Sequence, residues 1–217
     1  MGRKNQAYEY LINAIIENEL PPGTLIREME LSEKLNMSRS PIREALRQLE
    51  TEGVVISYPS RGTIVTPITV SDVEEIYELR SMFELWALEQ GFHRFTYDEL
   101  EALLNDFTDA YQNRDWKALH KTDLQFHQSI INKSGSKRLC NFVNTLNVQI
   151  ERIRRYGAKD VSRMDISFAE HTEVIRAIQS NDLEASKKTL KKHLRSVSNS
   201  AIETARMIDI SSHLISQ

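Results

Sequence analysis

Five short segments within the first 66 residues follow one another in an order that few folds accommodate. Apolar residues recur at helical spacing over 6–17, 28–35 and 41–52. Two β-branched runs, 54–58 and 63–66, are separated by a Pro-Ser-Arg-Gly turn and predict a hairpin. Three helices followed by a hairpin form a winged helix-turn-helix, so this segment is expected to bind DNA.

Beyond Pro67 the pattern becomes helical with few breaks. Two of the predicted starts carry capping boxes, Ser71–Glu74 and Thr96–Glu99. The predicted helices cover 71–93, 97–113, 115–133, 136–156, 163–180 and 182–208. The sequence therefore predicts a mainly α protein, with a winged helix-turn-helix domain over 1–67 and an all-helical bundle domain over 68–217.

Charge and composition limit where such a protein works and how it binds DNA. The net charge is −3, and residues 1–66 carry eight Lys or Arg against nine Asp or Glu. DNA binding must then depend on where the cations stand rather than on an excess of them. No apolar run is long enough for a membrane span and the N-terminus lacks a secretory signal, so we expect a cytoplasmic protein without a membrane partner. The single cysteine, Cys140, excludes an internal disulfide and a thiolate metal site.

Three arginines of the third predicted helix stand four residues apart. Arg39, Arg43 and Arg47 therefore form one stripe, about 100° round the helix from its apolar face. The planar guanidinium can hold a guanine edge or a phosphate with two hydrogen bonds. An alternative is a solvated helix face on which these arginines pair with Glu44 and Glu50.

The ends of this helix and of the hairpin add further candidates. Ser38 or Ser40 can serve as the N-cap, since Pro41 fits only in a first turn. Arg61 beside Gly62 would place a charge at the tip of the hairpin.

Four metal-ligating side chains occupy apolar faces of the second domain. Asp123 and His127 share one helix at a spacing of four, while His171 and His193 lie among apolar residues of two others. Such faces meet inside a bundle, where they can converge on a divalent cation. For any single histidine, a hydrogen-bonded place in the core is the alternative.

Arg80 lies on an apolar seam with Ile76, Phe83 and Ala87, an unusual place for a permanent charge. Its burial requires an anion, either a ligand or an internal partner such as a Glu on a neighbouring helix. Asn147 and Arg154 are further candidates for the same effector pocket.

The N-terminal segment resembles the DNA-binding domain of GntR-family regulators. The resemblance is carried by the stretch from Leu31 to Gly53, by Arg61-Gly62-Thr63, and by 20–24, Leu-Pro-Pro-Gly-Thr. It implies that operator DNA is the partner. With Ser40 added from the start of the same helix, the expected DNA-binding residues are Ser38, Arg39, Ser40, Arg43, Arg47, Arg61 and Gly62.

The second domain resembles the FCD effector domain of the FadR-like GntR subfamily. The motifs are Asp123–Ile130, Glu170–Ile175 and Lys192–Leu194. The resemblance implies a bundle of six or seven helices around a Zn²⁺ or Ni²⁺ ion held by Asp123, His127, His171 and His193. Three histidines and a carboxylate suit such metals better than Mg²⁺ or Ca²⁺. It also implies that Arg80, in the motif Glu78-Leu79-Arg80, meets the carboxylate of a small organic acid.

The sequence as a whole predicts a homodimeric regulator that reads a short inverted repeat and responds to a small carboxylate effector. Two alternatives remain at this point. In one the metal itself is the signal and Arg80 is purely structural. In the other the Asp and His residues activate water in a metal-dependent hydrolase or isomerase, although no additional general acid or base stands out and the winged helix is left unexplained.

Overall fold

The computed structural model describes residues 2–59, 61–157 and 162–215, and these divide into two compact units. The N-terminal unit groups Met1–Asp72 with Thr145–Tyr156 and Thr204–Gln217. The bundle unit consists of Val73–Asn144 and Gly157–Glu203. The domain boundary between residues 67 and 68 stays a prediction, because the N-terminal unit also includes parts of two helices from the C-terminal half of the chain.

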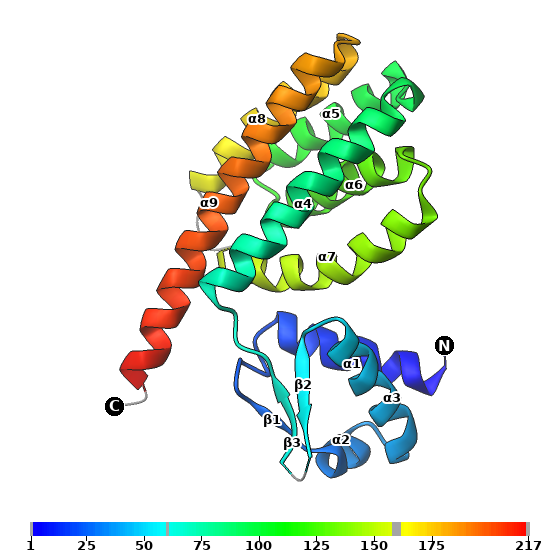
Figure 1. The fold of residues 1–217 in the computed structure, drawn as a ribbon. Helices are drawn as coiled ribbons and strands as arrows, with labels where there is room; N and C mark the ends of the chain where they lie inside the picture. Colours follow the sequence, from blue (N-terminus) through cyan, green and yellow to red (C-terminus); the bar gives the residue numbers. More distant parts are fainter. Residues whose placement is uncertain (1, 60, 158–161, 216–217) are drawn as a thin grey trace. The chain divides into compact units, whose positions relative to one another are not determined.

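The N-terminal unit contains the predicted three helices and hairpin (Figure 1). Its elements are α1 (Arg3–Ile16), β1 (Leu25–Ile26), α2 (Glu28–Lys34), α3 (Arg39–Thr51), β2 (Val55–Tyr58) and β3 (Gly62–Val65). The apolar face of α3, with Ile42, Ala45, Leu46 and Leu49, is buried in a core shared with α1 and the strands. Apolar periodicity along each helix therefore fixes how α3 is seated, and its opposite face is left for solvent.

The sheet has one strand more than the sequence predicts. β1 pairs antiparallel with β3 and gives the order β1-β3-β2. A strand of two residues is too short to show the alternation of apolar and polar residues by which a strand is recognised in a sequence. At the hairpin turn Gly62 has φ +92°, and a Cβ there would lie 3.0 Å from Leu25 Cδ1. Glycine is therefore required by the backbone at this position, whatever its role at DNA.

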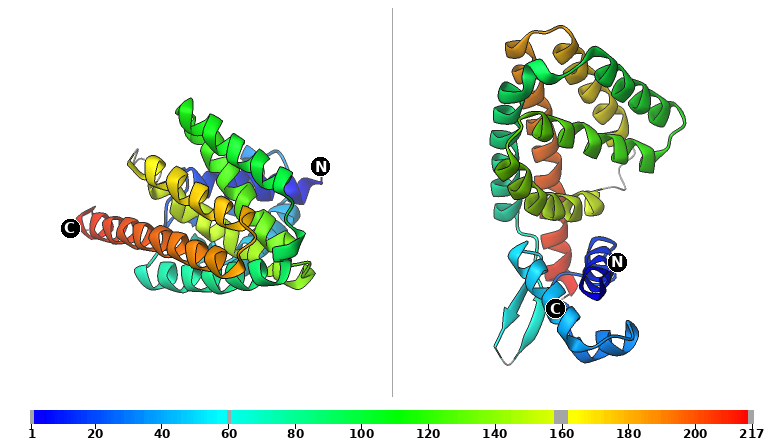
Figure 2. Two further views of the ribbon diagram at one scale, coloured as in Figure 1. Left: turned by 90° about the horizontal axis from the view of Figure 1, so that it is seen from above. Right: turned by 90° about the vertical axis from the view of Figure 1, so that its right-hand side faces the viewer.

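The bundle unit is built from helices that begin near their predicted starts. They are α4 (Val70–Gly91), the 3₁₀ turn η1 (Phe92–Arg94), α5 (Tyr97–Gln112), α6 (Trp116–Lys133), α7 (Lys137–Gly157), α8 (Ser162–Gln179) and α9 (Leu183–Ile215). α5 packs against both α6 and α8 (Figure 2). The predicted fold class, a winged helix-turn-helix followed by an all-helical domain, is confirmed.

Three local predictions require correction. The capping box of α4 is Thr69 with Asp72, not Ser71 with Glu74, because the Asp72 amide donates to Thr69 Oγ1 and the Thr69 amide donates to the Asp72 carboxylate. The box at Thr96 and Glu99 is present as predicted. Ser38 is the N-cap residue of α3 but makes no side-chain cap hydrogen bond, and Ser40 lies inside the helix.

The third correction concerns the last helix. α9 continues to Ile215, past the predicted end at 208. Within the described ranges, no helix combines the length and the apolar character needed to cross a membrane.

Candidate metal centre and DNA-reading helix

Three helices of the bundle unit bring the four predicted ligands together. Asp123 and His127 stand one turn apart on α6, His171 comes from α8 and His193 from α9. All four are buried, and one potential ligand atom of each lies within 4.8 Å of the others. His127 Nε2 is 3.3 Å from His171 Nε2 and 3.2 Å from His193 Nε2, and Asp123 Oδ1 is 2.9 Å from His171 Nε2.

The second nitrogen of each ring has an acceptor of its own. His127 Nδ1 lies 2.6 Å from Glu84 Oε2, and His193 Nδ1 lies 3.0 Å from Glu170 Oε2. His171 Nδ1 lies 2.7 Å from the backbone carbonyl of Ser167. A carbonyl or carboxylate oxygen only accepts, so each Nδ1 must carry the hydrogen and donate it. A neutral imidazole carries only one hydrogen, so with that hydrogen on Nδ1 all three Nε2 lone pairs face one another. The His171 Nε2 lone pair then also faces Asp123 Oδ1 at 2.9 Å, with no hydrogen between them.

Burial and charge keep the two carboxylate-bound rings neutral and their partners ionised. Desolvation lowers the pKa of His127 to about 4 and that of His193 to about 3, although the adjacent carboxylates oppose the shift. Burial alone would raise the pKa of Glu84, but His127 and Arg80 outweigh it and lower this pKa to about 2. The pKa of Glu170 also falls to about 2, because hydrogen bonds from His193 and Ser196 and the charge of Arg163 outweigh desolvation.

The cluster therefore presents three imidazole lone pairs and a carboxylate to one small volume. Two Nε2 atoms at 3.2–3.3 Å that both lack hydrogen cannot bond to each other. A divalent cation satisfies such a donor set, and the donation of each Nδ1 to an acceptor is the usual outer shell of metal-bound histidines. The residues present therefore fit the implied metal.

Glu84, which sequence reasoning missed, joins this cluster to Arg80. Arg80 is buried, and its Nε donates to Glu84 Oε1 at 2.6 Å. The anion that neutralises Arg80 thus stands one turn along α4 and not on a neighbouring helix. The spacing of four on a buried helix face was the available signal. Arg80 Nη1 is also buried, and no hydrogen-bond partner for it exists among the described residues.

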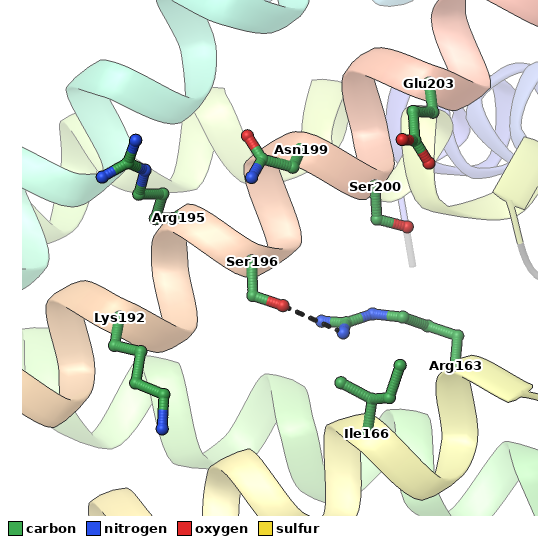
Figure 3. A pocket seen from close by; sticks show the side chains of 8 residues that line it. All are labelled: Arg163, Ile166, Lys192, Arg195, Ser196, Asn199, Ser200 and Glu203. Atoms are coloured by element: carbon green, nitrogen blue, oxygen red, sulfur yellow. Dashed lines mark hydrogen bonds between the residues drawn. The ribbon is translucent and has the colours of Figure 1, made fainter.

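Glu170 is the second outer residue that the sequence analysis did not identify. It joins His193 to Arg163, whose Nη2 lies 3.2 Å from Glu170 Oε2. Arg163 and Ser196 also line a cavity of about 430 Å³ between α8 and α9 (Figure 3). Two of the cations at this cavity are already neutralised, Arg163 by Glu170 and Lys192 by Glu173 at 2.9 Å. The other two charged residues of the lining, Arg195 and Glu203, are opposite in sign, so the cavity and the carboxylates paired with it carry no excess of positive charge.

The other two effector candidates, Asn147 and Arg154, belong to α7. Both are half-buried and lie in the segment that groups with the N-terminal unit. Arg80 belongs to the bundle unit. A role for Asn147 and Arg154 in effector binding stays a prediction.

The arginine stripe of α3 is exposed, as the sequence predicts. Arg39, Arg43 and Arg47 are all solvent-accessible, as are Arg61 and Gly62 at the hairpin turn. The alternative, in which these arginines pair with Glu44 and Glu50 of the same helix, is not observed for the described residues. Ser40 donates to Glu44, and the Ser57 amide donates to Glu50 at 2.7 Å. Of the three stripe arginines, only Arg43 has a carboxylate partner within the described part of the chain, and that partner is Glu28 of α2.

Comparisons with known proteins place both units in context. The model of the bacterial regulatory proteins of the gntR family matches residues 3–65, and the FCD domain model matches residues 75–196. The chain is 27% identical to the uncharacterized HTH-type transcriptional regulator YdhC of Bacillus subtilis, over 87% of this chain and 86% of that protein. It is 25% identical to the HTH-type transcriptional repressor RspR of Escherichia coli, over 90% and 87% respectively.

A solved structure shows the same fold over nearly the whole length. E. coli McbR/YncC superposes with a TM-score of 0.76 at 21% identity, covering 94% of this chain and 98% of that chain.

Proposed function

Because this chain belongs to the gntR family of bacterial regulatory proteins and carries an FCD domain, we propose that a small carboxylate bound beside a divalent metal controls its affinity for operator DNA. The chain is a transcriptional regulator and not an enzyme, which removes the hydrolase alternative. The proposal has four parts, which are the metal, the acid, the dimer and the DNA contacts. Operator DNA lies in the bacterial cytoplasm, so the proposal puts the protein there.

The metal part of the proposal rests on one observation, the convergence of Nε2 lone pairs with a buried carboxylate. Asp123, His127, His171 and His193 would hold the ion, with Zn²⁺ or Ni²⁺ favoured by the nitrogen-rich donors. A bound divalent cation would supply a Lewis-acidic attachment point for an anionic oxygen. The chain's contribution is to fix the three rings through Glu84, Glu170 and the carbonyl of Ser167.

The acid part rests on Arg80. A guanidinium with a buried nitrogen that no described residue satisfies needs a further acceptor, and a carboxylate provides oxygens of the right charge and geometry. Arg80 connects to the metal cluster through Glu84 and His127, so an acid at Arg80 would be sensed by a ligand ring. Asn147 and Arg154 are further candidates only.

The DNA part rests on the exposed stripe of α3 with the hairpin beside it. Arg39, Arg43 and Arg47 would contact bases or phosphates in the major groove, with Ser38 and Ser40 at the start of the helix and Arg61-Gly62 at the wing. One winged helix covers only a few base pairs. A homodimer on a short inverted repeat doubles the contact and is the arrangement we propose.

A specific observation supports a second candidate, in which the metal alone is the signal. Glu84 already neutralises Arg80, so Arg80 could be structural and the cation could be sensed without an acid.

One experiment separates the two candidates. Operator-like duplexes selected from a random pool are titrated with protein that is metal-free, loaded with Zn²⁺ or Ni²⁺, or loaded and mixed with a panel of small carboxylates. The proposal expects an acid to change DNA affinity of the loaded protein by about five- to 150-fold. A response to metal that no acid modifies would establish the sensor, and no response to either would rule out control by the bundle unit. Sedimentation of the same complexes reports whether two protomers bind each duplex.

A further inference from the structure

Among the described arginines of the proposed DNA surface, Arg43 alone is held by a carboxylate from another helix. We propose that Glu28 is a positioning residue, which presents Arg43 for base reading and withdraws its charge from DNA phosphates. The inference rests on the proposed role of α3 in DNA binding. It adds a residue of α2 that the sequence analysis did not assign to any function.

Glu28 contacts Arg43 through one nitrogen of the guanidinium, Nε. Arg43 Nε lies 3.0 and 2.8 Å from the two carboxylate oxygens of Glu28. Neither terminal nitrogen of Arg43 is bonded to any residue in the described part of the chain. Those two nitrogens are sufficient to donate to O6 and N7 of a guanine in the major groove. Glu28 therefore occupies the part of Arg43 that an end-on base contact does not need.

Restraint is the first consequence of this pair. The Arg43 side chain is 56% exposed, so without a partner it would sample many rotamers. Glu28 is the first residue of α2 and is 31% exposed, which makes it the better anchored of the two. Holding Arg43 in one orientation reduces the entropy that base recognition would otherwise cost.

Charge compensation is the second consequence. Arg39, Arg47 and Arg61 form no ion pair among the described residues and are suited to bind phosphates of any sequence. A phosphate close to Arg43 is also close to the Glu28 carboxylate, which repels it. Strong binding of a phosphate by Arg43 therefore requires that Glu28 first move away. The pair therefore lowers non-specific affinity more than specific affinity, which widens the ratio between them.

The test compares Glu28→Gln, Arg43→Ala, the double variant Glu28→Gln/Arg43→Ala and the wild-type protein. Glu30→Gln is the matched control, because Glu30 also lies on α2 and pairs with an exposed arginine, Arg27 at 3.2 Å. Dissociation constants are measured by fluorescence anisotropy over a range of salt concentrations. The two probes are a duplex selected by the wild-type protein from a random pool and a random-sequence duplex of equal length. Circular dichroism verifies that each variant is folded.

We expect Glu28→Gln to bind the random duplex more tightly, with a salt slope steeper by about 0.9 per protomer. The ratio of selected to random affinity should fall at least about fivefold, the lower end of what one bidentate base contact provides. The change should disappear when Arg43 is already Ala. Equal changes in Glu30→Gln, or a change that persists without Arg43, would mean that Glu28 acts only through overall charge.

Two further outcomes separate this inference from the proposed function. If Glu28→Gln alters neither probe while Arg43→Ala weakens the selected duplex, Arg43 reads DNA but Glu28 is only a structural partner. If Arg43→Ala leaves the selected duplex unaffected, the role of Arg43 at DNA is wrong, and the inference about Glu28 is overturned with it.

Discussion

Each histidine of the cluster is oriented by a hydrogen-bond acceptor that contacts its Nδ1 atom. Glu84 orients His127, Glu170 orients His193, and the carbonyl of Ser167 orients His171. These contacts decide which nitrogen faces the centre, and burial keeps the rings of His127 and His193 neutral. At this scale the site consists of the four proposed ligands and of the residues that orient them.

Replacement of His171 by Ala is expected to lower bound Zn²⁺ or Ni²⁺ sharply, because one of three imidazole donors is lost. Elemental analysis of the purified protein gives the metal content per protomer. His93→Ala is the control, since His93 is exposed and lies outside the cluster. Wild-type metal content in His171→Ala would count decisively against the site.

The Arg80 side chain gives a second prediction at this scale. Arg80→Ala leaves Glu84 buried without its cation and is expected to destabilise the protein by about 3–5 kcal/mol. Arg80→Lys keeps the charge beside Glu84 but loses the planar fork. We expect Arg80→Lys to retain the fold, the metal and basal DNA binding, while the response of DNA affinity to the carboxylate effector weakens.

Acid titrations of DNA complexes check this prediction, with thermal unfolding as the test of the fold. An unchanged acid response in both Arg80 variants would make Arg80 a structural partner of Glu84 and nothing more.

At the scale of the element, α3 combines a buried apolar face with an exposed cationic one. Ile42, Ala45, Leu46 and Leu49 fix the rotation of the helix, and this rotation exposes the arginine stripe. The neighbouring helix α2 modifies the stripe through Glu28, which the sequence of α3 alone does not reveal.

Arg39→Ala and Arg43→Ala are each expected to weaken binding of a selected duplex by about 1–3 kcal/mol, provided that these side chains read bases. Fluorescence anisotropy at fixed salt measures the effect. Arg176→Ala, an exposed arginine of α8, serves as the control. Should both α3 variants bind with wild-type affinity, another element must read the DNA.

At the scale of the whole molecule, the two units have separate hydrophobic clusters. One cluster contains residues of α1, α2, α3 and the strands, and the other contains residues of α4 to α9. A ligand in the bundle unit can change DNA affinity only if it binds one state of the protein better than another. Separate cores also imply that variants of the metal cluster leave the DNA-binding helices folded.

For protein freed of metal by a chelator, the free energy of unfolding should decrease as the pH falls below about 6.5. The pKa values of His127 and His193 are lowered to about 4 and 3 in the folded state, so the unfolded chain binds protons first. The free energy of unfolding then changes with pH by at most about 2.7 kcal/mol per pH unit for the two rings together. Below about pH 4.5 the lowered pKa values of Glu84 and Glu170, about 2, add to the loss in the same direction.

Urea unfolding at a series of pH values measures this dependence. His193→Asn should make the slope between pH 6.5 and 4.5 shallower by up to about 1.4 kcal/mol per pH unit. A wild-type stability that stays flat over this interval would show that these histidines are not buried in neutral form.

Local patterns in the sequence determined the order of the elements, the apolar face of α3, its arginine stripe, and the helix faces that carry Asp123, His127, His171 and His193. These features repeat with the period of a helix or occur within a few residues, so spacing alone reveals them. The start of α4 shows the limit of this signal, because two candidate boxes overlap and only the backbone geometry selects Thr69 with Asp72.

Tertiary structure alone decided the partners that set orientation and charge. Glu84 meets His127 across 43 positions of sequence, Glu170 meets His193 across 23, and Glu28 meets Arg43 across 15. No local period connects such residues, because their approach follows from how whole helices pack. The sequence thus contains the ligands and the arginines, whereas the proton on each ring and the pairing of each arginine depend on contacts that exist only in the folded chain.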